Sequence, residues 1–129
     1  MNTLDKENII GISALLVHAA KIDEQYSDHE KKLIKEFIMS YLKKENIDEI
    51  LVKAEELEKN SNQLLNFTNI IKKENNDIKS DIIKHLWKII ISDKSIDQYE
   101  SNLMRRICGL IYFPDKMSAE IKLKILNTK

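Results

Sequence analysis

Two short stretches of the sequence carry acidic residues at matching positions. Asp23 is followed seven residues later by Glu30, and Asp93 is followed seven residues later by Glu100. Carboxylate oxygens are the ligands that hard divalent cations such as Ca²⁺, Mg²⁺ and Mn²⁺ prefer, although the loops are too short for an EF-hand. Asp23, Glu30, Asp93 and Glu100 are therefore candidate metal ligands, and no organic cofactor is expected.

The acidic residues of each stretch differ in what they need from their surroundings. The spacing of Ser27–Glu30 and of Asp97–Glu100 is that of a capping box, which satisfies helix amides without any ligand. Asp23 and Asp93 fall at expected C-terminal helix ends, where the helix dipole disfavours an anion by about 0.3–1 kcal/mol. Their compensating partner is either a set of loop amides, as in an Asx-turn, or a bound cation. Both alternatives stay open at this stage.

The two acidic stretches belong to a longer internal repeat. Asp23–Glu30 and Asp93–Glu100 share one pattern: Asp, two residues, an apolar residue, a cap, two residues and Glu. The flanking apolar positions align without a gap, for example Leu16 with Leu86. The repeat predicts two similar helix-loop-helix units related by a pseudo-twofold axis, with both loops at one end of the molecule.

Apolar residues recur at helical spacing along nearly the whole chain. The spacing predicts an all-α fold, a compact bundle of about seven helices with two pseudo-symmetric repeats. The expected helices cover 4–22, 28–44, 47–59, 64–71, 77–92 and 98–112, and a seventh begins at Ser118, whose hydroxyl would cap it. We expect one domain over 1–129, with repeat halves at about 4–44 and 78–112. Tyr26 and Ile96, the apolar residues of the polar loops, should be substantially buried.

Composition excludes several classes of protein. The chain has 129 residues, of which 43% are hydrophobic and 33% charged, a balance typical of a folded domain. Two Gly and one Pro are too few for a many-stranded β-sandwich, and a single Cys excludes a disulfide framework. The formal net charge of zero argues against nucleic-acid binding.

Membrane insertion and export are not expected. The longest uncharged stretch, residues 8–20, is shorter than a spanning helix, and the segment before it lacks the basic residues of a signal peptide. We therefore expect a cytoplasmic protein.

The remaining reactive side chains favour structural roles. His18, His29 and His85 lack the spacing of a metal-ligand pair, so we expect a hydrogen-bonded His18 and an exposed His29. Cys108 lies among apolar residues and is expected to be a small buried hydrophobe. Trp87 should pack at the core edge with its N–H bonded to a carbonyl, or anchor a partner. Phosphate-binding Gly loops, nucleophile motifs and metallohydrolase motifs are absent, so the protein is not expected to be an enzyme.

The segments HAAKIDEQYSDHEKKLIKEFI and WKIIISDKSIDQYESNLMRRICGLI resemble the TerB-like, tellurite-resistance-associated family. Its hallmark, present twice, is a helix with an Ala-rich or apolar end, then Asp-Gly, an apolar residue and a Glu that opens the next helix. The resemblance covers Leu4 to Leu126, and departs from the family where the expected Gly is Glu24 or Lys94.

The resemblance implies a domain of about seven helices with an acidic site for divalent cations at Asp23, Glu30, Asp93 and Glu100. A related domain in some membrane-associated J-domain co-chaperones makes an adaptor role compatible. We therefore expect a domain that binds a divalent cation, a protein partner or both through its paired acidic loops, in a stress-response or scaffolding role. The alternative is a metal-free adaptor whose loops only cap helices. We expect a protein partner, and homodimerisation stays open.

Overall fold

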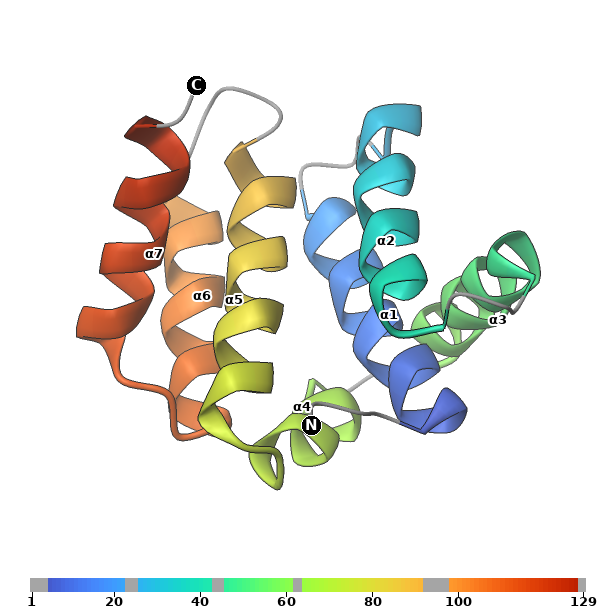
Figure 1. Ribbon diagram of the computed structural model, residues 1–129, viewed down its shortest axis with the longest axis horizontal. Coiled ribbons are helices and arrows are strands. Elements are labelled where there is room, and N and C mark those ends of the chain that lie inside the picture. Colours follow the sequence, from blue (N-terminus) through green and yellow to red (C-terminus); the bar gives the residue numbers. More distant parts are fainter. Residues whose placement is uncertain (1–4, 23–25, 43–45, 62–63, 92–97, 128–129) are drawn as a thin grey trace.

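The computed structural model describes residues 5–22, 26–42, 46–61, 64–91 and 98–127, with the backbone alone for 98–100 (Figure 1). These residues form α1 (Lys6–Ala20), α2 (Asp28–Tyr41), α3 (Ile47–Lys59), α4 (Leu65–Lys72), α5 (Asn76–Ile91), α6 (Gln98–Leu110) and α7 (Asp115–Asn127). No strand occurs in these ranges. The predicted all-α fold of seven helices is confirmed, and six of the seven begin within two residues of the expected position.

The seventh helix begins earlier than predicted. It starts at Asp115, directly after Pro114, and the Ser118 amide already donates to the Pro114 carbonyl at 3.1 Å. The prediction that the Ser118 hydroxyl caps this helix was therefore wrong. A proline lacks an N–H, and at the start of a helix that N–H would have no intrahelical acceptor. The Ser118 hydroxyl is instead buried, where it accepts the Trp87 indole N–H at 2.9 Å.

Helix α1 lies at the centre of the molecule. It packs against α2, α3, α4 and α5, and each residue from Gly11 to Val17 is buried. This position explains why its sequence is almost free of charge, since a helix covered on all sides is apolar all round. In the described ranges, no helix has both the length and the apolar character needed to cross a membrane.

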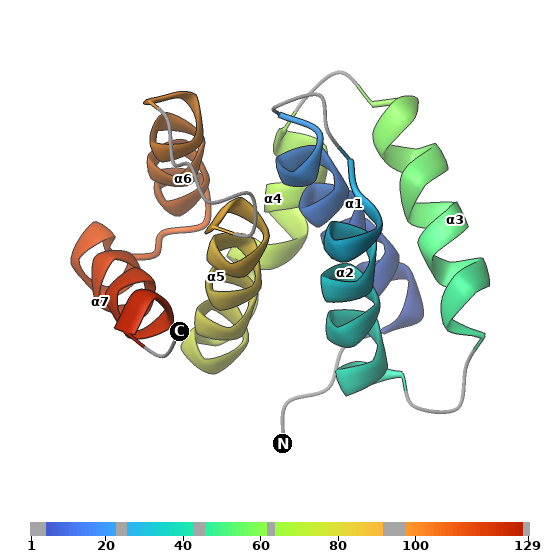
Figure 2. The same ribbon diagram turned by 90° about the horizontal axis from the view of Figure 1, so that it is seen from above.

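In each half of the molecule, the third helix packs back on the first helix of the preceding hairpin. In the first half α3 packs mainly on α1, and in the second half α7 packs mainly on α5. Figure 2 shows the two groups of three on opposite sides, with α1 and α5 at the centre and α4 between the groups in sequence. The halves differ in one respect, because α2 contacts α1 whereas α6 packs mainly against α4 and α7.

Candidate functional site

Both predicted loops are bounded by helix ends that lie at the same end of the molecule. Figure 1 shows α1 and α5 rising to this end and α2 and α6 descending from it. Helices α1 and α5 are also in direct contact. The loop residues 23–25 and 92–97 lie outside the described residues, so the placement of the two loops at this end stays a prediction.

The start of α2 is fixed by a complete capping box. The Ser27 hydroxyl accepts the Glu30 amide at 3.2 Å, and Oε1 of Glu30 accepts the Ser27 amide at 2.8 Å. Glu30 is only 4% exposed, which is unusual for a carboxylate and follows from this reciprocal bonding. The capping role predicted for Ser27 and Glu30 is confirmed.

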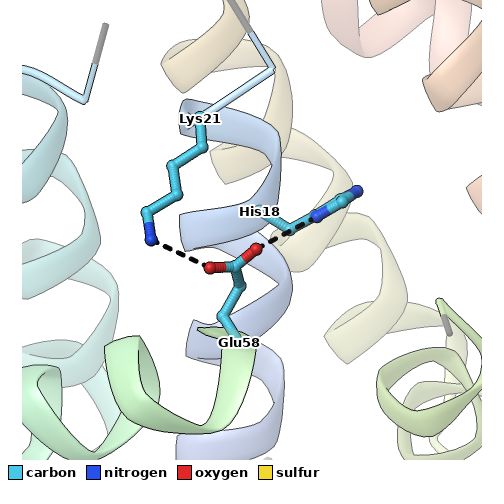
Figure 3. A network of polar contacts seen from close by, with 3 residues as sticks. All are labelled: His18, Lys21 and Glu58. Atoms are coloured by element: carbon cyan, nitrogen blue, oxygen red, sulfur yellow. Dashed lines mark hydrogen bonds and ion pairs between the residues drawn. The ribbon is translucent and has the colours of Figure 1, made fainter. Parts of the chain in front are cut away.

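The last turn of α1 is joined to α3 by a polar network (Figure 3). The Lys21 ammonium lies 3.0 Å from Oε1 of Glu58, and Nδ1 of His18 lies 3.3 Å from Oε2 of the same carboxylate. The Glu58 side chain is 13% exposed, so these contacts are partly shielded from solvent. His18 is thus a hydrogen-bonded residue at the edge of the core, as the sequence predicted.

Tyr26 links the start of α2 to the same network. Its ring is partly buried against the core, with Nζ of Lys31 at 5.0 Å and Nζ of Lys21 at 5.8 Å from the ring centroid. The hydroxyl is buried, and no hydrogen bond of good geometry reaches it from the described residues. Burial, with the nearby Glu55 carboxylate, raises the pKa of Tyr26 far above its ordinary value. Tyr26 is neutral at physiological pH. Its predicted burial is confirmed in part, because the ring is partly rather than substantially buried.

Residues 10–123 match the family model described as tellurite resistance protein TerB. The chain belongs to the TerB family. This finding confirms the resemblance drawn from the two helix-loop-helix segments. No curated protein and no solved structure matches the chain.

Of the four acidic residues expected to bind metal in this TerB domain, one has a described side chain. That residue is Glu30, in the capping box. Asp23 and Asp93 lie outside the described residues, as does the loop residue Ile96, and Glu100 is described only by its helical backbone in α6. Among the residues with described side chains, no group of three His, Cys, Asp or Glu residues is arranged to hold a metal ion.

The other reactive residues of the TerB domain have structural environments. Nδ1 of His85 lies 2.8 Å from the Asp81 carbonyl oxygen, and burial lowers the pKa of His85. Burial raises the pKa of the Cys108 thiol, which suits the small buried hydrophobe predicted. His29 is exposed, as expected. Trp87 packs in the core as predicted, but its N–H donates to a hydroxyl rather than to a carbonyl.

Sequence reasoning missed Glu58 and Glu55 of α3. Glu58 is separated by 40 residues from His18, and such a distant pairing leaves no local spacing pattern. Its one signal is that α3 carries four Glu residues, Glu49, Glu55, Glu56 and Glu58, of which Glu55 and Glu58 are partly buried. A partly buried carboxylate on an amphipathic helix indicates a polar partner on the neighbouring helix.

Proposed function

We propose that this TerB domain binds a divalent cation at the end of the molecule where its two helix hairpins open. Asp23, Glu30, Asp93 and Glu100 would supply the carboxylate oxygens. The observation that carries this proposal is the shared direction of the hairpins, which brings the ends of α1 and α5 and the starts of α2 and α6 to one end of the fold (Figures 1 and 2).

Electrostatics at this end supports a bound cation. Helices α1 and α5 both direct their C-terminal, partially negative ends toward it, and each is followed within two or three residues by an aspartate, Asp23 or Asp93. The partially positive starts of α2 and α6 lie at the same end and offset these dipoles, so the repulsion that remains is between the carboxylates. A divalent cation between the loops would offset this repulsion, and hard cations prefer oxygen ligands of this type.

Glu30 fits a ligand role in one respect. Its carboxylate is buried and held at the first turn of α2 by the Ser27 amide, so little side-chain entropy would be lost on binding. The same bond also explains Glu30 without a metal.

The proposed role is binding rather than catalysis. A cation shared between the first and second hairpins would stabilise their relative position and so control what the domain presents to a protein partner. A sensing or scaffolding role, such as one in a stress response, follows from such a switch. We propose no organic cofactor and no reaction at this site.

Thermal melting of the metal-free protein with each of Ca²⁺, Mg²⁺, Mn²⁺ and Zn²⁺ tests the proposal at constant pH. A cation that binds only the folded state stabilises it by RT ln(1 + [L]/Kd), about 2.7 kcal/mol at a hundredfold excess over Kd. For a domain of this size, this corresponds to a rise in Tm on the order of 10 °C. Asp23→Asn combined with Asp93→Asn should abolish the rise and leave the helical circular dichroism unchanged.

A matched control removes the same charge from the opposite end of the molecule. Asp5→Asn with Asp115→Asn changes two exposed residues at the starts of α1 and α7. This control should respond to the cation as the natural sequence does. A Tm that no cation shifts, or a shift that survives in the Asp23 and Asp93 double variant, contradicts the proposal.

The complete capping box favours a second candidate function. Because Ser27 and Glu30 satisfy each other at 2.8 and 3.2 Å, the first loop needs no cation to order the start of α2. In this alternative the domain is a metal-free adaptor that binds a protein partner. The same melting experiment separates the two, since the adaptor shows no shift with any cation and the double variant is only less stable.

A further inference from the structure

We propose that the groove between α5 and α7 is a dimer interface that binds a second copy of this chain in antiparallel orientation. The inference is independent of the cation site, because the groove is built from other residues. It names the surface and the geometry of the homodimer that the sequence left open.

The groove is an open cavity of about 730 Å³ on one face of the molecule. Its apolar lining comes from α7, where Met117, Ile121 and Ile125 follow one another at intervals of four residues. Leu123 and Leu126 of the same helix are 56% and 40% exposed. Helix α7 therefore has apolar side chains both in the groove and outside it. Its contact with α5 leaves part of this apolar surface exposed. Burial of this surface favours association.

Charges along the groove are separated by sign. Asp77, Asp81 and Glu120 precede Lys84, Lys88 and Lys124 along their helices, and α5 and α7 rise in the same direction in Figure 1. One end of the groove is therefore acidic and the other end basic. In the described part of the chain, none of Asp77, Glu120, Lys84, Lys88 and Lys124 forms an ion pair within its own molecule.

The charge order on α5 is self-complementary. Asp77 lies four residues before Asp81, and Lys88 lies four residues after Lys84. Consider a second α5 that lies antiparallel on the first, with the twofold axis midway between Asp81 and Lys84. Asp81 then faces Lys84 of the second copy. Asp77 likewise faces Lys88 of the second copy. At 1.5 Å per residue, Asp77 and Lys88 are about 16 Å apart along the helix, too far to pair within one molecule.

Helix α7 lies beside α5 and adds apolar surface to the same face. The Trp87 indole N–H donates to the Ser118 hydroxyl at 2.9 Å, so the first turns of α7 lie level with the second half of α5. The twofold axis between Asp81 and Lys84 therefore passes near the start of α7, and the apolar side chains of α7 add to the surface that a second copy buries. Such an interface is isologous, since each contact occurs twice. The formal net charge of zero adds no long-range repulsion between two copies.

Charge reversal tests the interface, with the molar mass of the full chain measured by sedimentation equilibrium over a range of concentrations. The natural sequence should dimerise. Lys88→Glu sets like charges against Asp77 of the second copy. Asp77→Lys does the same against Lys88 of the second copy. Each variant alone should dimerise at least about 100-fold more weakly, because like charges that face each other across an interface are strongly unfavourable.

The equimolar mixture of these two variants is the decisive sample, since every reversed pair is again attractive and a heterodimer should form. These substitutions leave Asp81 in place, which binds the Tyr41 hydroxyl at 2.8 Å. Lys32→Glu, on the exposed face of α2, matches the charge change outside the groove and should dimerise like the natural sequence. A monomeric natural sequence, as expected if another protein occupies the groove, overturns the proposal. Dimers that survive both reversals, or a mixture that stays monomeric, also overturn it.

Discussion

At the scale of single residues, Glu30 shows how a helix cap explains a buried carboxylate. Its buried side chain accepts the Ser27 amide, which is sufficient reason for a Glu at the third position of α2. The same bond holds the carboxylate at the end of the molecule where the hairpins open. A ligand role for Glu30 is part of our proposal, and the double variant of Asp23 and Asp93 tests it.

His85 makes the stability of the domain depend on pH. Its ring packs edge-on against Phe37 at 5.2 Å, and burial lowers its pKa in the folded state. In the unfolded chain the imidazole titrates near pH 6.5. As the pH falls below about 6.5, His85 binds a proton in the unfolded chain but not in the folded domain. The free energy of unfolding therefore decreases as the pH falls, until the folded-state pKa of His85 is reached. Above this pH range the stabilising contribution of neutral His85 is fully present.

Urea unfolding at about pH 7.5 and pH 5.5 measures this effect. His85→Leu, which introduces the residue found at the equivalent repeat position Leu15, should reduce the loss of stability on acidification. His29→Gln, at an exposed position, should leave the loss unchanged. An acid response that is the same in His85→Leu and in the natural sequence would show that His85 is not its source.

At the scale of helices, the two glycines occupy opposite environments. Gly109 lies in α6, where an added Cβ would meet no atom within 4 Å. Gly11 lies in α1, where an added Cβ would collide with Cδ1 of Ile70 on α4. The glycine in α1 therefore permits a close approach between two helices, whereas the glycine in α6 has no such use.

This difference predicts unequal results for two identical substitutions. Gly109→Ala should raise the free energy of unfolding by about 0.5–1 kcal/mol, because alanine restricts the unfolded chain and favours helix. Gly11→Ala should raise it by less, because the end of the Ile70 side chain must first move aside. Thermal melting of the two variants side by side checks this, and equal gains in Tm would show that Ile70 moves without cost.

Helix positions could be predicted from the sequence because apolar periodicity and caps are local signals. The capping box at Ser27–Glu30 is an example, and its geometry is as expected. The start of α7 was not predicted correctly, since a serine with capping potential competed with Pro114 four residues earlier. The Glu58 network and the hydroxyl partner of Trp87 depend on which helices become neighbours. Whether four carboxylates meet is likewise decided by packing between halves, which no spacing along the chain encodes.

At the scale of the whole molecule, α1 is the element on which the others pack. Its four neighbouring helices come from both halves of the chain, and its central residues are fully covered. Opening α1 locally would expose apolar surface on all its sides, so its amides should exchange with solvent only through global unfolding.

Hydrogen exchange resolved by residue tests this expectation. The amides of Ile12 to Leu16 should exchange most slowly, with a free energy of opening equal to that of global unfolding. Amides in α7, which is largely exposed outside its contact with α5, should exchange through smaller openings. Exchange in α1 that is faster than global unfolding would contradict the central role of this helix.

The contact between α1 and α5 has a consequence for how such a fold can arise. A chain that ended after α3 would leave bare the side of α1 that α5 now covers, and this side is apolar. Two copies of that short chain could shield each other by pairing their first helices about a twofold axis. Gene duplication and fusion, with α4 as the connecting segment, would turn such an ancestral pair of chains into this single chain. The contact at the centre of the molecule is, in this view, a former boundary between two polypeptides.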